Sequence, residues 1–409
     1  MSEVAAPRRI AALDLIRGVA VLGILTVNLF NFAGPGSAAY SPNLPQPGSV
    51  ADQWLFGAVL LLFEGKMRAL FTILFGASLL LFVERAEERG EHGARLQRRR
   101  LGWLALFGYL HFALLWDGDI LFLYAVVGFA ALALRRAPPL PLVLVALMLF
   151  GFWQGGGAAL FAQAVSAEAA VREGTASKAQ TDYHAQIVTE ARMADGDDLA
   201  EARLGLFDQA RSRLTDRPWL PLSLVLLVFG ETLPLMLIGM ALYRTGFFSG
   251  QWSRRRLWLL AGIGIGAGGA LTLAFTRWAH GHGYPEFAMQ LAIHFLLGFP
   301  HLLMALGYGA LLVLAAPRLL QSWLGARLAA AGRMAFSNYI ATSVVMSAVF
   351  GGWGLGLFGT LGAARAWLLV PLVWLLMLAW SKPWLARFGQ GPLEWLWRCL
   401  TEGRLLAPR

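Results

Sequence analysis

The chain alternates long apolar stretches with short, mostly basic segments over almost its whole length. A stretch of roughly 20 apolar residues can cross ~30 Å of hydrocarbon as a helix, which rises about 1.5 Å per residue. Ten such stretches lie approximately at residues 10–30, 52–83, 101–116, 120–134, 141–164, 220–243, 257–275, 287–315, 334–358 and 367–380. Because lipid cannot hydrogen-bond bare backbone, the pattern predicts an all-α integral membrane protein with about ten transmembrane helices.

Two polar parts accompany these stretches. Residues 165–218 are rich in Ala, Glu, Asp, Gln and Arg, and we expect a partly helical segment outside the membrane that is too short and polar to form a domain alone. Residues 383–409 mix Trp, Leu and Arg, as in a helix lying in the membrane interface. The expected organisation is five helices in residues 1–164, the polar segment, five helices in 219–382, and a cytoplasmic amphipathic tail.

Basic residues are concentrated on alternate loops. On the side of the N-terminus they include Arg8, Arg9, Arg98–Arg100 and Arg254–Arg256. Arg98–Arg100 end an expected solvated loop over residues 84–100. The short loops on the other side carry Arg277 and Arg365. Cytoplasmic loops carry the excess of Lys and Arg, so both termini are predicted to be cytoplasmic and residues 165–218 extracytoplasmic. With only 14% charged residues, the net charge of +10 indicates contact with membrane lipids and not with nucleic acid.

Ionisable side chains inside the apolar stretches are the main functional candidates, because placing them in lipid costs about 2.5–3.5 kcal/mol each. Asp14 and Arg17 are three residues apart and can pair on one helix face, either as an interfacial ion pair or as part of a site. Asn28 lies about three turns further along roughly the same face, where its amide could bond a neighbouring helix.

A second charged group, Glu64, Lys66 and Arg68, interrupts the stretch at residues 52–83. If this stretch is one tilted helix, the three charges lie near mid-depth and must line a polar cavity. If the helix breaks there, they are residues of the membrane interface. We favour the cavity, since the apolar run before Glu64 is too short to cross the membrane and return.

The third group is His111, Asp117 and Asp119, at the turn between the third and fourth stretches. A histidine beside a carboxylate is suited to act as a general base or in a proton relay. The alternative is a tight turn in which the aspartates cap the next helix, and this is strongest for Asp119. Weaker candidates are Glu231, His294, His301, Ser337 and Asn338, while the His280–His282 pair is too weak a signal to predict a metal.

Six motifs are distributed over nearly the whole chain: LDLIRGVAVLGILTVN at 13–28, FTILFGASL at 71–79, GYLHFALLWDGDILFLYAVVG at 108–128, LIGMALYRTGFF at 237–248, GRMAFSNY at 332–339 and GPLEWLWRCLT at 391–401. Together they resemble the YeiB family, bacterial multi-pass membrane proteins with a domain of unknown function that are sometimes described as transporters. The resemblance implies a location in the bacterial inner membrane.

The first stretch also resembles that of transmembrane acyltransferases, which transfer an acyl group, often acetyl from cytoplasmic acetyl-CoA, to a sugar across the membrane. Many of these enzymes carry an arginine, ten further residues and a histidine; here Arg17 has the place of the arginine and Asn28 that of the histidine. Residues 31–52 contain no histidine, so the resemblance moves the base to His111.

The leading hypothesis is therefore an acyl-CoA-dependent enzyme acting on an extracytoplasmic glycan or lipid-linked acceptor, without a metal. Arg17 with Asp14, Lys66 and Arg68 would form the donor site together with the cytoplasmic arginines. His111 oriented by Asp117 or Asp119 would be the base, and Asn28 would donate to the thioester oxygen. The alternative is a transporter or lipid flippase in which Asp14, Lys66, His111 and Asp117 titrate. A scaffold without catalysis is a third reading.

Overall fold

The computed structural model describes residues 10–407, which form helices joined by loops, with no β-strand in that range. Within it, seven helical units are long and apolar enough to cross a membrane. They are α1 (Ala11–Ala33), α2–α3 (Val50–Glu88), α6 (Pro139–Glu173), α9 (Leu220–Arg244), α10 (Arg254–Gly281), α12 (Gly298–Leu319) and α15–α16 (Ala363–Phe388). The all-helical prediction is confirmed, and the apolar helices indicate a membrane protein.

Three further helices occupy the remaining predicted stretches. α5 (Leu121–Ala133) and α14 (Ala335–Phe350) are apolar but shorter, only ~20–24 Å long. α4 (Gly93–Leu114) carries Arg95 and Arg98–Arg100 in its first turns. Length and composition thus identify seven candidate spans in the described residues. Each of the ten predicted apolar stretches nevertheless contains helix, in the predicted order.

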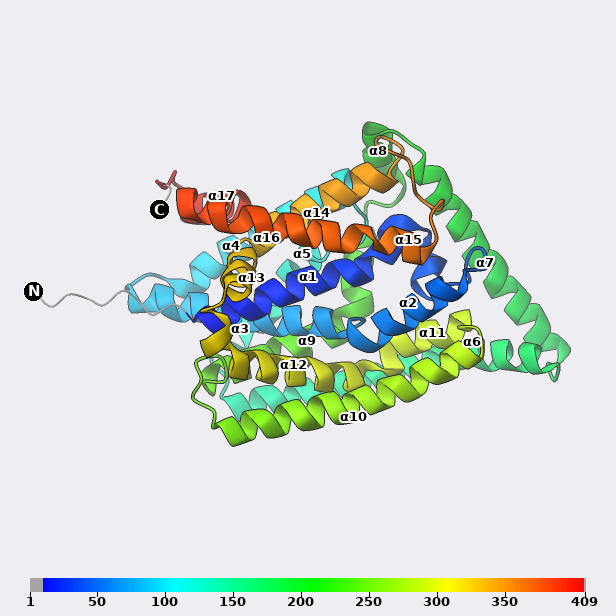
Figure 1. Cartoon of the computed structure of the whole chain (residues 1–409), viewed down its shortest axis with the longest axis horizontal. Coiled ribbons are helices and arrows are strands. Elements are labelled where there is room, and N and C mark those ends of the chain that lie inside the picture. The colour runs from blue at the N-terminus through cyan, green and yellow to red at the C-terminus, as the bar shows by residue number, and fades with distance from the viewer. Residues whose placement is uncertain (1–9, 408–409) are drawn as a thin grey trace, which may run out of the picture.

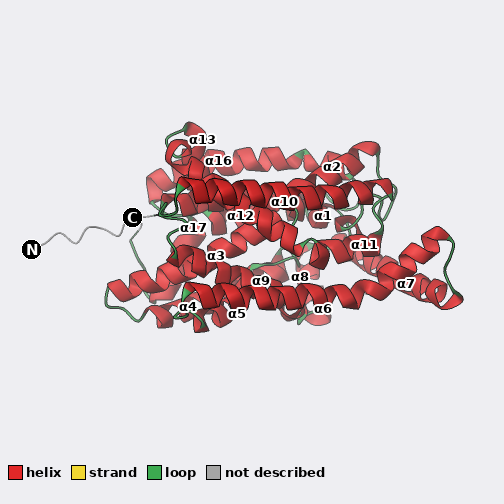
Figure 2. Cartoon of the chain, turned by 90° about the horizontal axis from the view of Figure 1, so that it is seen from below, coloured by secondary structure: helices red, strands yellow, loops and turns green. Residues whose placement is uncertain are grey.

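The apolar helices run side by side along the long axis of the molecule (Figure 1). The start of α1 and the end of α17 (Pro392–Glu402) lie at one end, which we call the terminal end. The opposite, far end is crossed by α7 (Lys178–Ala202) and α8 (Leu206–Asp216), and α7 projects beyond the bundle when the molecule is turned (Figure 2).

The centre of the bundle is α3 (Lys66–Glu88), which packs against α1, α4, α5, α9 and α12. Glycines bring the backbones of α3 and α9 into direct contact. A Cβ atom added to Gly76 would lie 2.0 Å from the Met236 carbonyl oxygen, and one added to Gly239 would lie 1.9 Å from that of Ile73. Small residues at such crossings allow the close packing that holds membrane helices together.

The second predicted stretch is broken, so its single-helix interpretation is wrong. α2 (Val50–Leu62) begins at a capping box formed by Ser49 and Asp52 and ends just before Phe63. Gly65 then adopts a φ of 71°, a left-handed conformation that glycine accepts readily, and α3 starts at the next residue. Of the charged group, Lys66 is nevertheless 0% exposed, while Glu64 and Arg68 are half-buried.

Other boundaries also differ from expectation. The expected solvated loop over residues 84–100 is largely helical, since α3 ends at Glu88 and α4 begins at Gly93. Residues 165–218 are helical over most of their length, as α6 continues to Glu173 and is followed by α7 and α8. The stretch at 287–315 divides into α11 (Glu286–Leu291), a π-helical turn η2 (Ala292–Leu296) and α12. Arg8 and Arg9, used in the charge argument, lie outside the described residues.

Candidate functional site

The predicted pair on α1 forms and borders a large cavity at the terminal end. Arg17 Nη1 lies 3.3 Å from Asp14 Oδ1, and Arg17 Nη2 donates to Ser78 Oγ on α3 at 2.7 Å. The cavity, the terminal chamber, has a volume of about 920 Å³. Among the described residues its charged lining comprises Arg17, Arg85, Arg89, Arg100, Arg398 and Arg404 with Asp14, Glu91, Glu394 and Glu402. Arginines therefore outnumber carboxylates on its walls.

A smaller, mainly apolar cavity of about 220 Å³, the inner chamber, lies deeper in the bundle. It shares Arg17, Ser78, Arg100, Glu394 and Trp397 with the terminal chamber, so the two adjoin along these residues. Its remaining walls include Phe71, Phe75, Leu104, Ile120, Leu121, Tyr124, Phe336 and Tyr339. A molecule with a charged end and an apolar end matches this arrangement of an arginine-rich chamber next to a mainly apolar one.

His111 and Asp119 form a buried pair beyond the inner chamber. His111 Nδ1 lies 2.8 Å from Asp119 Oδ1, and both side chains are 1% exposed. Asp119 Oδ2 also accepts from the backbone N–H of Phe122 at 2.7 Å, which caps the start of α5. Capping and pairing therefore coexist: the helix start fixes the carboxylate, and the carboxylate orients the imidazole. With Nδ1 as donor, Nε2 is left as a proton acceptor, and it has no hydrogen-bond partner among the described residues.

Asp117 takes a different direction from Asp119 and lines a third cavity, the far-end cavity, of about 140 Å³. This cavity lies between the end of α1, the α4–α5 turn, α7, α8 and the end of α14; its walls include Asn31, Trp116, Asp117, Asp198, Glu201, Arg213 and Ser347. Asp198 accepts from the backbone N–H of Gly36 at 3.0 Å. Burial raises the pKa of the Asp198 carboxyl, and the bond from Gly36 opposes that rise.

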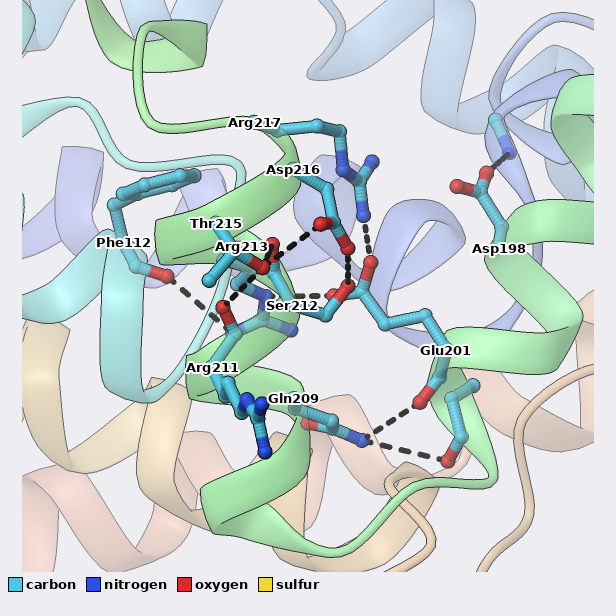
Figure 3. A network of polar contacts seen from close by, with 12 residues as sticks. Phe112, Asp198, Glu201, Gln209, Arg211, Ser212, Arg213, Thr215, Asp216 and Arg217 are labelled. Atoms are coloured by element: carbon cyan, nitrogen blue, oxygen red, sulfur yellow. Dashed lines mark hydrogen bonds and ion pairs between the residues drawn. The ribbon is translucent and has the colours of Figure 1, made fainter.

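An ion-pair network fastens α8 to the end of α4 (Figure 3). Glu201 accepts from Arg213 Nε at 2.7 Å and also pairs with Arg217. Arg213 Nη1 donates to the carbonyl oxygen of Phe112 at 3.3 Å, directly beside His111 in the chain. The polar segment therefore covers the far end and holds the helix end that carries His111.

The remaining predicted site residues are dispersed. Asn28 is half-buried and lines a space of about 10 Å³, bordered also by Tyr339, Thr342 and Ser343. Lys66 Nζ donates to the Leu60 carbonyl oxygen at 2.6 Å, so it caps the end of α2. Arg68 Nη1 pairs with Glu231 Oε2 at 3.1 Å. Neither Lys66 nor Arg68 lines the chambers described above.

Glu394 and Tyr339 of the chambers were not identified from the sequence, and Arg100 was named only as one of the cytoplasmic arginines. Arg100 lies between the rings of Phe82 and Trp397, with its guanidinium carbon 4.6 Å and 3.9 Å from the ring centres. Glu394 accepts from the backbone N–H groups of Phe336 and Ser337 at 2.9 and 3.1 Å, which docks α17 on the start of α14. Tyr339 lines the inner chamber. The sequence signal for Tyr339 and Glu394 was their place in the motifs GRMAFSNY and GPLEWLWRCLT, which carried no assigned role, and Arg100 lies in neither motif.

The weaker candidates mostly make contacts between helices. His294 Nε2 lies 3.0 Å from the Tyr40 hydroxyl, and Asn338 bonds Ser381 and Trp380 on α16 at 3.1 and 2.8 Å. Within residues 10–407, no three His, Cys, Asp or Glu side chains are grouped so as to hold a metal ion.

Together these features define a multi-helix membrane protein with a buried histidine–aspartate pair between cavities at its two ends. The chain belongs to the family of bacterial membrane proteins that includes YxaH and YeiB. It is 32% identical to the uncharacterized protein YxaH of Bacillus subtilis (strain 168), covering 96% of this chain and 94% of that protein. It is 31% identical to the uncharacterized protein YeiB of Escherichia coli (strain K12), covering 96% of each.

Two further comparisons agree with this assignment. The family described as "Protein of unknown function (DUF418)" matches residues 242–404. An uncharacterized 39.9 kDa protein from the amylase 3' region of Bacillus acidopullulyticus is 37% identical over 128 residues, 31% of this chain and 34% of that protein. No solved structure matches the chain significantly.

Proposed function

We propose that this protein is a membrane-bound acyltransferase that takes an acyl group from a cytoplasmic acyl-CoA and gives it to an extracytoplasmic glycan or lipid-linked acceptor. The observation that carries the proposal is the position of the His111–Asp119 pair between chambers at opposite ends of α1 and α4. The proposal includes ten membrane crossings, a location in the bacterial inner membrane, and a cytoplasmic terminal end, as the arginine distribution indicates.

The terminal chamber supplies the chemistry for an anionic donor. Guanidinium groups bind phosphates through paired, charge-assisted hydrogen bonds, and Arg17 and Arg100 lie where the terminal and inner chambers meet. The coenzyme A phosphates would lie among the arginines, and the thioester and acyl chain would lie along the apolar inner chamber. In this proposal Arg17, held by Asp14, stays in the donor site, whereas Lys66 and Arg68 are structural.

The His111–Asp119 pair supplies the base. Nε2 accepts the proton of the acceptor hydroxyl as that oxygen bonds to the thioester carbon; the carbon–sulfur bond breaks, and the proton passes to the departing thiolate. Asp119 keeps the imidazole in the required tautomer and balances its transient positive charge. Asn28, which borders the same small space as Tyr339, is the proposed donor to the thioester oxygen.

Coenzyme A binding tests the proposal. In detergent, a ligand at a hundredfold excess over its Kd stabilises the protein by about 2.7 kcal/mol, which raises the melting temperature. We expect this increase for the parent and for His111→Ala, and its loss in Arg17→Gln and Arg100→Gln. Arg277→Gln, an exposed arginine near the end of α10, is the matched control and should keep it. If coenzyme A and acetyl-CoA leave the parent's melting temperature unchanged, the donor site is refuted.

The second candidate function is proton-coupled transport, and the broken helix favours it. Discontinuous helices carrying charges at mid-membrane form the ion sites of many transporters. Here the break at Gly65 lies beside Lys66, Glu64 and the Arg68–Glu231 pair. A transporter needs no acyl donor, so binding of coenzyme A that depends on Arg17 separates the two functions.

A further inference from the structure

Two aromatic side chains enclose the His111 imidazole. The ring centre of Tyr339 on α14 lies 5.1 Å away, and that of Trp116 in the α4–α5 turn lies 6.4 Å away. Tyr339 is 6% exposed and Trp116 is 7% exposed. The two rings belong to different cavities, because Tyr339 lines the inner chamber and Trp116 lines the far-end cavity.

Tyr339 is the wall between the inner chamber and His111. Its hydroxyl accepts from the backbone N–H of Ile120 at 3.4 Å, beyond the usual range for such bonds, so the ring is held mainly by packing. The small space of about 10 Å³ next to Asn28 borders the same ring. A displacement of this side chain would therefore join the inner chamber to the imidazole.

Trp116 is the corresponding wall toward the far-end cavity. Its ring stacks on Phe32 of α1, with centres 4.1 Å apart and planes inclined by 27°. Its buried Nε1 has no hydrogen-bond partner in the described part of the chain, and neither has the neighbouring His111 Nε2. A donor and an acceptor left unbonded on adjacent buried rings are unfavourable, which indicates that a polar group meets them in another state.

We propose that Tyr339 and Trp116 are two gates that control access to His111 from the terminal and far ends, respectively. They are positioning residues for the proposed reaction: displacement of Tyr339 admits the thioester, and displacement of Trp116 admits the acceptor hydroxyl. The assignment of reactants rests on the proposed acyl transfer, whereas the two-sided occlusion rests only on the geometry. With both gates closed, His111 is sealed from water at both ends, which keeps the thioester from hydrolysis.

Cysteine accessibility tests the gates without any acyl donor. Cys399 is the sole cysteine of the chain, so Cys399→Ser gives a background without thiols. In that background, His111→Cys is treated with a membrane-impermeant anionic methanethiosulfonate, added to right-side-out or inside-out vesicles. Ser78→Cys, in the terminal and inner chambers, and Asp117→Cys, in the far-end cavity, report free access from each end.

We expect His111→Cys to react at least tenfold more slowly than both reference cysteines from either side. Adding Tyr339→Ala should accelerate its labelling tenfold or more from the terminal end only, and adding Trp116→Ala should do so from the far end only. Tyr339→Phe keeps the ring and should remain slow. Tyr339→Leu replaces the alanine variant if that protein is not monodisperse in detergent.

Two outcomes would overturn the gates. In the first, His111→Cys is labelled as fast as a reference cysteine while both rings are intact. In the second, removal of either ring does not increase the labelling rate of His111→Cys from one side only. Failure of the acyl transfer is recognised separately. One-sided opening by each ring in a protein that does not bind coenzyme A would leave the gates in place and favour transport.

Discussion

At the residue scale, two buried basic side chains illustrate opposite reasons for placing a polar group inside a membrane protein. Lys66 has an internal partner, the Leu60 carbonyl, which belongs to the last turn of α2 and would otherwise lack a donor. His111 is paired on one nitrogen only, and its other nitrogen points at no described hydrogen-bonding group. The first arrangement satisfies the backbone, whereas the second leaves capacity for a reaction.

Substitution of Lys66 should therefore reduce stability without affecting ligand binding. Lys66→Met leaves the buried Leu60 carbonyl without its donor, which costs about 1–3 kcal/mol. We expect a lower melting temperature in detergent and an unchanged shift on addition of coenzyme A. Lys382→Met, at an exposed position on α16, is the control and should melt like the parent. A stable Lys66→Met protein that no longer binds its ligand would instead assign Lys66 to a site.

Residues near each other in sequence could be predicted to interact, while distant ones could not. Asp14 and Arg17 share a helix face by their spacing of three, and the ion pair confirms this prediction. His111 and Asp119 are eight residues apart across a turn. The sequence left both Asp117 and Asp119 open as partners, with capping the stronger expectation for Asp119, and only the bend decides between them. Tyr339 reaches His111 through tertiary packing, for which a single sequence contains no spacing rule.

At the element scale, α17 lines the terminal chamber, packs on α4 and is joined to the start of α14 through Glu394. Its carboxylate accepts from the first N–H groups of α14, an anion placed at the positive end of a helix. Trp397 from the next turn covers Arg100. The amphipathic tail expected over residues 383–409 is thus helical over Pro392–Glu402, while residues 383–388 still belong to α16, and α17 forms a wall of the candidate donor site.

The docking of α17 should weaken as the pH rises. Burial raises the pKa of the Glu394 carboxyl above its ordinary value of 4.5, against the opposing bonds from Ser337. The docked state then binds the proton more tightly than the free state, so docking is strongest below pH 4.5 and decreases as the pH passes the raised pKa. Hydrogen exchange of residues 392–402, corrected for intrinsic rates, should show decreasing protection over that range.

Glu394→Gln should abolish this pH dependence, because the amide keeps an acceptor but has no proton to lose. Glu402→Gln, a more exposed carboxylate on the same helix, should retain it. Equal pH dependence in the parent and in Glu394→Gln would show that another group controls docking.

The all-helical class and the order of the apolar segments were accessible from the sequence, whereas only seven of the ten expected spans qualify by length and composition in the described residues, and several helix ends differ. Apolar length indicated each helical segment, since hydrocarbon thickness sets that length. The break at Gly65 was not resolved, because a glycine between charges fits both a continuous and a broken helix. The charge of residues 84–100 predicts a loop, yet Arg85 lies on α3, Arg95 and Arg98–Arg100 lie on α4, and Arg100 turns inward between aromatic rings.

At the scale of the whole molecule, the two ends of the bundle have different chemistry. The terminal end holds an arginine-rich chamber of about 920 Å³, and the far end holds a smaller cavity bordered by carboxylates and covered by α7 and α8. A reaction between a cytoplasmic anion and an extracytoplasmic acceptor requires these ends to face opposite sides of the membrane. The proposed function therefore depends on this orientation as much as on any single residue.

Reporter fusions test this orientation. They also test whether a helix that is too short or too charged to qualify as a span crosses the membrane. A reporter after Gly36 or after Gly118 should lie on the extracytoplasmic side, and one after Glu91 should lie in the cytoplasm, because α1, α2–α3 and α4 each cross once in the proposed topology. The fusion after Gly118 is the decisive one, since α4 begins with four arginines and ends near His111. Phosphatase activity at Gly36 and Gly118, with fluorescence of a cytoplasmic reporter at Glu91, is the expected result. If the reporters after Glu91 and Gly118 lay on the same side, α4 would not cross, His111 would not lie between the two compartments, and transfer across the membrane through this pair would be excluded.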